Sequence, residues 1–451
     1  MAAIQTLRRL VDIISESLDS IEGVYGRAGT QFPNLNDSKL HDQAAEALQH
    51  DPAVASQILN IVAAASQISA AVSNPAMFVL NASHAPTITA CLRVACELDV
   101  AERLRDAGSE GLHIETIAPG KIDSGLLARV LRLLATHHIF REVSPDVFAN
   151  NRISAVLDKG KALEESSSTE SRLANATGPA AVVEMLSDDN TKVVAFLGDA
   201  VQTTQGEVRP GNLPFNHAFK TDEIFYTWVE RPENVWRRRR FGFAMDATAA
   251  WEPPQAILIG FDWSALQAGS LVVDVGGDLD NAIKGAKLHW QSNFSSHIDS
   301  EMVTFQGHNF FTPQPITDAS IFLLRSIVHN WPDEKAVQIL QRLRAAAQPT
   351  TRLLVVDMIL AYACAPLVSG ETHAVTIEGT TRPSAPAPLL ANWGPASSFA
   401  YTLDLTVYSF HGGEERTLGA FLNVFARAGW KLVRVYHPPA PQLSHLECIP
   451  V

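Results

Sequence analysis

Cysteine is scarce in this sequence, and its scarcity excludes two kinds of site. Only four cysteines occur among 451 residues, and no two of them have the paired spacing that a structural zinc site uses. They are also too few and too scattered to form a disulfide framework. We therefore expect reduced thiols and a cytoplasmic protein.

Positive charge is the second deficit. The chain carries 35 lysines and arginines against 48 aspartates and glutamates, which gives a formal net charge of -13 at pH 7. A surface of that sign repels nucleic acid and anionic membranes. We also expect no secretory signal at the N-terminus and no charge-free stretch long enough to span a membrane. The expected partners are a small molecule and another protein chain, with no nucleic acid and no membrane.

Apolar residues are plentiful, at 46% of the chain, and their spacing divides the sequence. They recur at helical spacing over residues 6–21 and 39–72, so residues 1–74 are predicted to form a helical N-terminal extension. The pattern of residues 75–155 indicates several short helices and then two extended runs around a turn, Ser144-Pro145-Asp146. A helical cluster closed by a small hairpin is typical of a winged helix.

The predicted winged helix is acidic where DNA binding needs basic side chains. Its acidic residues are Glu97, Asp99, Glu102, Asp106, Glu110 and Glu115. A dimerisation role is therefore favoured over DNA binding.

Residues 156–250 are predicted to contain a connector and helices that line a substrate pocket. Aromatic residues are dense from Pro214 to Trp251, which suits a pocket wall and suits a helical core equally well. From Ser270 onward, buried strands alternate with helices, which is the pattern of a parallel sheet. Residues 251–451 are therefore predicted to form a doubly wound α/β domain.

Three ordered motifs carry the chemistry, at residues 324–334, 356–360 and 412–417. With them the chain resembles the plant and fungal O-methyltransferases that act on phenolic and other hydroxylated metabolites, from about residue 75 to residue 451. The resemblance implies an α/β fold, with a Rossmann-like class I methyltransferase domain preceded by a mainly α winged-helix dimerisation domain. It also implies S-adenosyl-L-methionine as cofactor, a small hydroxylated aromatic secondary metabolite as substrate, and a homodimer.

In that family the histidine of the first motif is the general base, and here it is His329. Asp357 and Glu415 match the acidic residues that flank it. The chemistry is consistent, because a phenol loses its proton as its oxygen attacks a methyl sulfonium, and a histidine titrating near neutrality can accept it. No metal is expected, since the carboxylates are not grouped as ligands and a histidine base makes a divalent ion unnecessary.

The resemblance also implies residues that contact the cofactor and the substrate. The cofactor group is Asp274, Gly276, Gly277, Asp278, Asn309, Phe310 and Arg325. The substrate group is Phe225, Trp228, Met245, Trp251, Asn330 and Trp331. Each apolar member of the substrate group fits a place in the core equally well.

The chain departs from the family directly after Gly277. Family members continue with a longer glycine-rich turn, a helix and a strand that ends in a ribose-binding acid, whereas Gly277 is followed at once by Asp278. The simplest alignment makes Asp278 the ribose acid and removes roughly 25 residues of a βαβ crossover. Such a loss takes ladder partners from a parallel sheet and weakens cofactor binding.

Three explanations of this departure stay open. In the first, an exon was skipped or a gene prediction mis-joined, and the parent protein is an ordinary methyltransferase. In the second, the chain is a natural, shortened protein that uses its pocket for methyl-independent chemistry, such as a pericyclic cyclisation. The third is an inactive partner that dimerises with a full-length relative.

Overall fold

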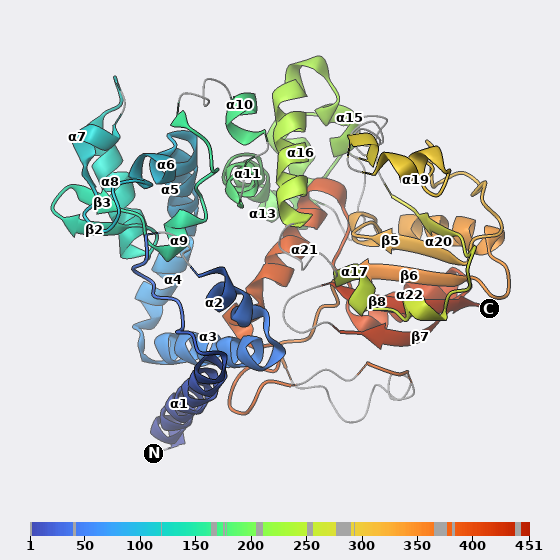
Figure 1. Ribbon diagram of the computed structural model, residues 1–451, viewed down its shortest axis with the longest axis horizontal. Coiled ribbons are helices and arrows are strands. Elements are labelled where there is room, and N and C mark those ends of the chain that lie inside the picture. The colour runs from blue at the N-terminus through green and yellow to red at the C-terminus, as the bar shows by residue number, and fades with distance from the viewer. Residues whose placement is uncertain are drawn as a thin grey trace.

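The computed structural model runs from an N-terminal pair of long helices, through a small helical domain with a hairpin, to an α/β sheet near the C-terminus (Figure 1). It describes residues 2–38, 42–118, 120–163, 169–174, 176, 178–203, 211–249, 256–276, 290–292, 294–364, 377–380, 384–437 and 443–451. The fold class expected from the sequence is confirmed.

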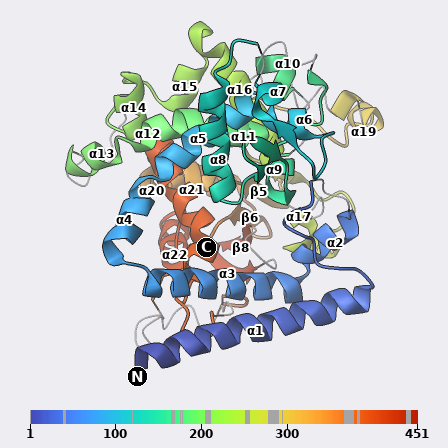
Figure 2. The ribbon, with the colours of Figure 1, turned by 90° about the vertical axis from the view of Figure 1, so that its left-hand side faces the viewer.

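The N-terminal extension is built on helices α1 (Ala2–Ala28) and α3 (Pro52–Val72), which lie side by side (Figure 2). Leu10 and Ile13 of α1 are buried because they face the alanines of α3. The short helix α2 (Gln43–Ala47) follows α1, and Asp42 caps it by accepting a hydrogen bond from the backbone N–H of Ala45.

Helix α3 corrects one expectation. We expected no charge-free stretch long enough to span a membrane, yet α3 has 21 residues without a charge and a mean hydropathy of 1.3, enough by length and composition. Core helices pass the same test, so this is weak evidence for a span. Part of its surface is covered: Trp393 Nε1 donates to Asn60 Oδ1 at 2.9 Å, and Gln67 donates to the carbonyl of Pro388 at 3.0 Å.

The next segment contains the expected helices and hairpin. Its helices are α4 (Pro75–Ser83), α5 (Ala85–Glu97), α6 (Val100–Leu104), α7 (Ile114–Ile117) and α8 (Ser124–Thr136). Its antiparallel strands are β1 (Leu112–His113), β2 (Arg141–Ser144) and β3 (Val147–Ala149), in the order β1-β3-β2. Strand β2 begins only at Arg141 because the preceding Phe140, with φ of 70°, has a left-handed backbone conformation that a strand cannot include.

Short helices then connect this segment to the sheet. They are α9 (Arg152–Ala155), α10 (Thr169–Leu173), α11 (Ala180–Met185), the π-helix η3 (Leu186–Asn190), α12 (Thr191–Val194), α13 (Leu197–Thr203), α14 (Pro214–Phe219), α15 (Phe225–Val229) and α16 (Val235–Ala249).

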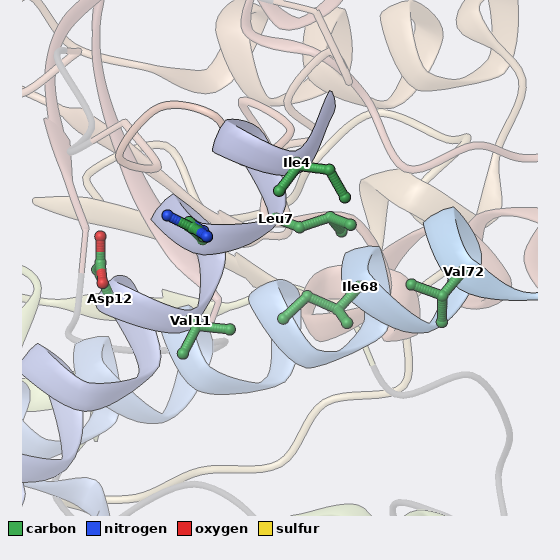
Figure 3. Close-up of a pocket in the computed structure, with 7 residues that line it drawn as sticks. Ile4, Leu7, Val11, Asp12, Ile68 and Val72 are labelled. Atoms are coloured by element: carbon green, nitrogen blue, oxygen red, sulfur yellow. The ribbon is translucent and has the colours of Figure 1, made fainter. Parts of the chain in front are cut away.

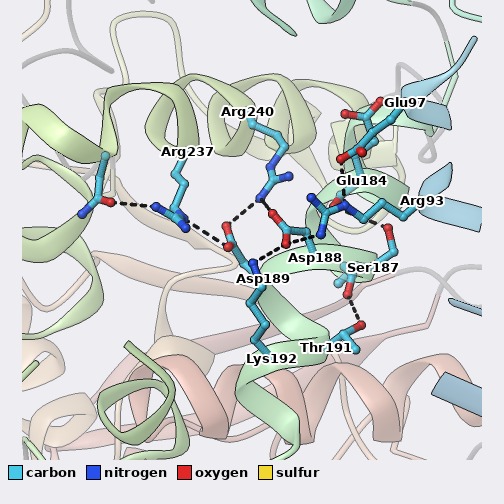
Figure 4. Close-up of polar contacts among 12 residues, drawn as sticks. Arg93, Glu97, Glu184, Ser187, Asp188, Asp189, Thr191, Lys192, Arg237 and Arg240 are labelled. Atoms are coloured by element: carbon cyan, nitrogen blue, oxygen red, sulfur yellow. Dashed lines mark hydrogen bonds and ion pairs between the residues drawn. The ribbon is translucent and has the colours of Figure 1, made fainter. Parts of the chain in front are cut away.

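A buried charge cluster joins these helices to α5 (Figure 4). Asp188 of the π-helix pairs with Arg93 of α5 at 2.6 Å and with Arg240 of α16 at 2.8 Å. Arg240 also pairs with Asp189 at 2.7 Å, and the Arg240 and Asp188 side chains are only 2% and 1% exposed. Buried pairs need close geometry to offset desolvation. The cluster therefore fixes how α16 sits against the winged-helix segment.

The α/β domain has a five-stranded sheet with the order β4-β5-β6-β8-β7. Strands β4 (Val272–Asp274), β5 (Ile321–Arg325) and β6 (Arg352–Asp357) are parallel, whereas β8 (Ser444–Pro450) is antiparallel to both β6 and β7 (Trp430–Tyr436). Helices α20 (Asp333–Ala346) and α22 (Leu418–Arg427) cover the face that bears Phe322 and Val355, and α17 (Ala256–Ile259) covers part of the other.

In the described residues, β4 forms one edge of this sheet. Leu271 and Val272 beside that edge are 41% and 39% exposed, which is unusual for a parallel sheet. Gly277 and Asp278, between which the truncation is predicted, lie outside the described residues.

Two loops meet at the carboxyl edge of β5 and β6: residues 326–332, which follow β5, and residues 412–417, which precede α22. Arg416 is 1% exposed, and its guanidinium donates to the carbonyls of Val328 and Trp331 at 3.0 and 2.8 Å and to Asp333 Oδ1. Gly413 lies so close to the same loop that an added Cβ would come within 2.0 Å of the His329 carbonyl oxygen. The third motif, residues 412–417, thus packs closely against the loop that contains His329 and is hydrogen-bonded to it.

We predict that Gly413→Ala destabilises the fold by about 1–3 kcal/mol, because the methyl would meet backbone atoms that cannot rotate away. Urea unfolding measures the change. Gly419→Ala is the matched control, since its Cβ meets nothing nearer than Thr417 Oγ1 at 3.9 Å. An unfolding midpoint for Gly413→Ala equal to that of the parent chain would show that the two loops are not packed this closely.

Candidate active site

His329 lies directly after β5, in the short 3-10 turn Val328–Asn330. The chain turns sharply there because Ser326, at φ of 53°, is left-handed, and its N–H donates to the carbonyl of Val356 at 3.0 Å. The turn points the imidazole at Glu415: Nδ1 lies 2.5 Å from Glu415 Oε1. The His329 side chain is 13% exposed and that of Glu415 is fully buried.

The charges around His329 favour its protonated form. Burial lowers the pKa of His329, but the hydrogen bond to Glu415 and the charges of Asp357 and Glu415 outweigh burial, so the pKa is raised. With Nδ1 donating to Glu415, Nε2 is the nitrogen that can accept a proton. The arrangement suits a base whose cationic form is stabilised once it has taken the proton.

Asp357 ends β6 and completes the group. It is fully buried, and its two oxygens make no well-formed hydrogen bond within the described residues. Burial raises the pKa of Asp357 to about 7; the charge of His329 opposes the rise and that of Glu415 adds to it. The structure thus brings together His329, Asp357 and Glu415, the three residues that the sequence predicted to act together.

Sequence reasoning missed three residues beside this group. Asp404 of helix α21 (Ser398–His411) accepts the backbone N–H of Glu415 at 2.8 Å. Arg416 belongs to the third motif, and its position next to Glu415 was a usable signal. His411 ends α21, and it is close enough to His329 for a charge there to lower its pKa. No pattern in the sequence singled out Asp404 or His411.

The predicted substrate residues do not form one group. Phe225 is 7% exposed and its ring lies 5.4 Å from that of His411, which connects it to the site. Trp228 packs deeper, with its ring 4.5 Å from that of Phe219. Met245 is 39% exposed on α16. Trp251 lies outside the described residues.

Asn330 and Trp331 also differ in what they contact. Asn330 Nδ2 donates to the carbonyl of Ser326 at 3.3 Å and so holds the turn. The Trp331 ring lies 5.8 Å from that of Phe310 and 4.9 Å from that of Phe311. Trp331, predicted to contact substrate, therefore packs with Phe310, which was predicted to contact the cofactor, and with the neighbouring Phe311.

The described cofactor candidates lie near the carboxyl ends of β4 and β5. Asp274 ends β4 with an exposed side chain, and Arg325 ends β5 beside it. Gly276 has φ of 145°, and an added Cβ would come within 2.3 Å of Ile327 Cδ1, so only glycine fits. Asn309 Oδ1 accepts the N–H of Phe311 at 3.0 Å and shapes the turn before the aromatic pair.

These residues fit one part of a nucleoside cofactor, because the Asp274 carboxylate and Gly276 lie at the carboxyl end of β4, and the Phe310 ring lies 5.8 Å from that of Trp331, which follows β5. Gly277 and Asp278 lie outside the described residues. No cluster of three or more histidine, cysteine, aspartate or glutamate side chains is placed to hold a metal within the described part of the chain.

Solved structures with the same fold cover nearly the whole chain. A structure of LepI with SAM aligns with a TM-score of 0.61 at 18% identity, covering 97% of this chain and 99% of that one. A structure titled a pericyclic reaction enzyme aligns with a TM-score of 0.60 at 18% identity, covering 97% and 100%. At this identity the likeness shows the fold alone.

Sequence comparisons go further. Residues 80–159 match the model of the O-methyltransferase dimerisation domain, and residues 271–382 match that of the O-methyltransferase domain. An O-methyltransferase of Armillaria gallica is 38% identical, with 99% of each chain covered. The 4-O-methyltransferase 1 of Phanerochaete chrysosporium is 34% identical, with 95% of each covered. This chain belongs to the O-methyltransferase family of enzymes.

Proposed function

We propose that the chain transfers a methyl group from S-adenosyl-L-methionine to a hydroxyl of a small aromatic secondary metabolite, with His329 as the general base. The observation that carries this proposal is the His329–Glu415 hydrogen bond beside the buried Asp357. It leaves one imidazole nitrogen for the substrate and stabilises the imidazolium that forms.

The proposed reaction moves one proton within the chain. As the substrate oxygen attacks, its proton passes to His329 Nε2, and Glu415 holds the ring through Nδ1. The cofactor supplies the electrophilic methyl group when bound. Asp274, Gly276, Asn309, Phe310 and Arg325 are the described residues that would hold it. No metal takes part in the proposed step.

We predict that His329→Gln lowers kcat/KM for methyl transfer by about 10²–10⁴-fold, the usual contribution of general acid–base catalysis.

Glu415→Gln removes a cause that raises the pKa of His329, so the base becomes neutral at lower pH and the rising limb of the pH–rate profile shifts to lower pH. Steady-state kinetics across pH measure both effects. Glu334→Gln, at an exposed helix position, should leave the profile unchanged. A profile that Glu415→Gln does not move would remove this pair from the mechanism.

We also propose that a segment of cofactor-binding structure is missing between Gly277 and Asp278. The alignment with the Armillaria relative has 482 positions, whereas this chain has 451 residues, so the relative has residues with no counterpart here. The exposed edge strand β4 supports the same proposal, because a neighbouring strand would cover Leu271 and Val272.

Calorimetric titration of S-adenosyl-L-methionine tests this proposal on two proteins: the 451-residue chain, and the same chain with a family-like segment restored after Gly277. We expect micromolar binding by the restored chain and binding at least tenfold weaker by the chain as it stands. Equal, tight binding by both would show that nothing essential is missing.

Product formed without the cofactor would favour methyl-independent cyclisation, the alternative suggested by the fold shared with a pericyclic enzyme.

We propose that the protein is a cytoplasmic homodimer and that α4 contributes to its interface. All nine residues of α4 are exposed, among them Phe78 and Leu80 at 45% and 52%. A mainly apolar hollow between α1 and α3 belongs to the same N-terminal region; Ile4, Leu7, Val11, Ile68 and Val72 line it together with the charged Arg8 and Asp12 (Figure 3). Large exposed apolar patches mark interaction sites. A second copy is the occupant we infer, because the last four residues of α4 lie within the matched dimerisation domain, residues 80–159.

We predict that Phe78→Asp with Leu80→Asp halves the mass of the particle in light scattering, because two charges would have to be buried at the interface. Val201→Asp is the control: Val201 is 73% exposed on α13, outside this surface, and its variant should keep the mass of the parent. A double variant that stays dimeric would exclude α4 from the interface. A parent chain with the mass of one subunit would exclude the homodimer.

A further inference from the structure

We propose that Asp404 is a positioning residue of this site: its carboxylate fixes the backbone of Glu415 in the place from which the Glu415 side chain bonds to His329. Asp404 belongs to α21 and acts through Glu415. This inference rests on the proposed function, because it concerns the pair to which we assign the proton transfer.

The backbone around Glu415 is held from two sides. Asp404 Oδ1 accepts the N–H of Glu415 at 2.8 Å. One residue earlier, the N–H of Glu414 donates to the carbonyl of His329 at 2.9 Å. Successive N–H groups of residues 412–417 are therefore bonded to α21 and to the loop that contains His329. Because the Cα of Glu415 directly follows the N–H that Asp404 holds, Asp404 sets where the Glu415 side chain begins.

The N–H of Glu415 depends on this acceptor. Among the residues that the structure describes, Asp404 is its one hydrogen-bond partner. Glu415 is only 3% exposed, so water has little access to replace the carboxylate. A buried N–H without an acceptor costs free energy. We therefore expect residues 412–417 to shift when the acceptor at position 404 is displaced.

A small shift of Glu415 is enough to weaken its bond to His329. Nδ1 of His329 lies 2.5 Å from Glu415 Oε1, and a charge-assisted hydrogen bond weakens as its atoms separate or lose alignment. The contact between Asp404 and the Glu415 backbone is therefore transmitted to the imidazole of His329.

Helix α21 gives Asp404 a firm base. The helix has 14 residues, and Gly412, with φ of 70°, closes it in the left-handed conformation. Asp404 lies in its middle, where aspartate is a poor helix former, so local propensity does not explain the residue. Burial raises the pKa of Asp404 and the N–H of Glu415 opposes that rise, so this donor stabilises the charged carboxylate.

The test measures the pKa of His329 in the full chain by NMR titration, with its signal identified from its absence in His329→Gln. Asp404→Glu keeps the charge and moves the carboxylate by one methylene, whereas Asp404→Asn keeps an acceptor oxygen in place and removes the charge. Because the bond to Glu415 raises the pKa of His329, Asp404→Glu should lower that pKa and Asp404→Asn should retain it. Asp357 of β6 and His411 of α21, which also act on or feel the charge of His329, stay unchanged in both variants.

A double variant shows whether Asp404 acts through Glu415. In a chain that carries Glu415→Gln, adding Asp404→Glu should lower the pKa of His329 no further, because the bond that Asp404 supports is already weakened. In steady-state methyl transfer, Asp404→Glu should lower kcat about 10-fold and change KM less than about twofold, since it displaces a positioned group. Asp404→Asn should restore most of that kcat.

Thr402→Ala is the matched control, because Thr402 lies on the same helix and its hydroxyl donates to carbonyls of that helix, those of Ser398 and Phe399. It should keep the pKa of His329 and the kcat of the parent chain. If Asp404→Glu keeps the parent pKa, or lowers it equally when Glu415→Gln is present, the inference is overturned. Failure of the proposed base is a separate result, in which His329→Gln keeps the parent rate of methyl transfer.

Discussion

The hydrogen bond between His329 and Glu415 joins two loops that are 86 residues apart in the chain, and the site depends on holding those loops together. Arg416 holds the two loops together, because its guanidinium donates hydrogen bonds to backbone carbonyls on both sides of His329. Gly413 permits the close approach because it has no side chain. One short motif, residues 412–417, thus supplies the hydrogen-bond partner of His329, the guanidinium that holds its loop, and the glycine that lets the two loops approach.

Low polarity gives this hydrogen bond its chemical effect. Three titratable side chains share a buried volume, so each charge is felt strongly by the others. Asp357 illustrates the balance: folded, it keeps its proton up to about pH 7, whereas an exposed carboxyl releases its proton near pH 4. Between those values unfolding releases a proton, so rising pH favours unfolding through this group. The buried Asp357 therefore costs the fold more stability as the pH rises from about 4 to about 7.

Much of the fold follows from the sequence because its signals are local. Residues 353–357 and 430–436 are continuous or alternating apolar runs, and both form strands. The group of His329, Asp357 and Glu415, for which we propose a catalytic role, was predicted from three motifs in fixed order. The sequence did not reveal which distant segments contact each other. Trp331 packs with Phe310 because a turn of the chain brings the two rings together. His411 lies near the site because α21 ends beside the loop that contains His329. Neither arrangement leaves a periodic pattern.

The N-terminal helices show how composition alone can mislead. Helix α3 is apolar enough to span a membrane, yet its polar Asn60 and Gln67 both bond to the segment 384–397, which leads into α21. Helix α21 in turn contains Asp404, which accepts from Glu415, and His411. A continuous path of contacts therefore runs from the extension to Glu415, the hydrogen-bond partner of His329. The extension thus supports the segment that leads into α21, and part of the apolar surface of α3 is buried inside the protein.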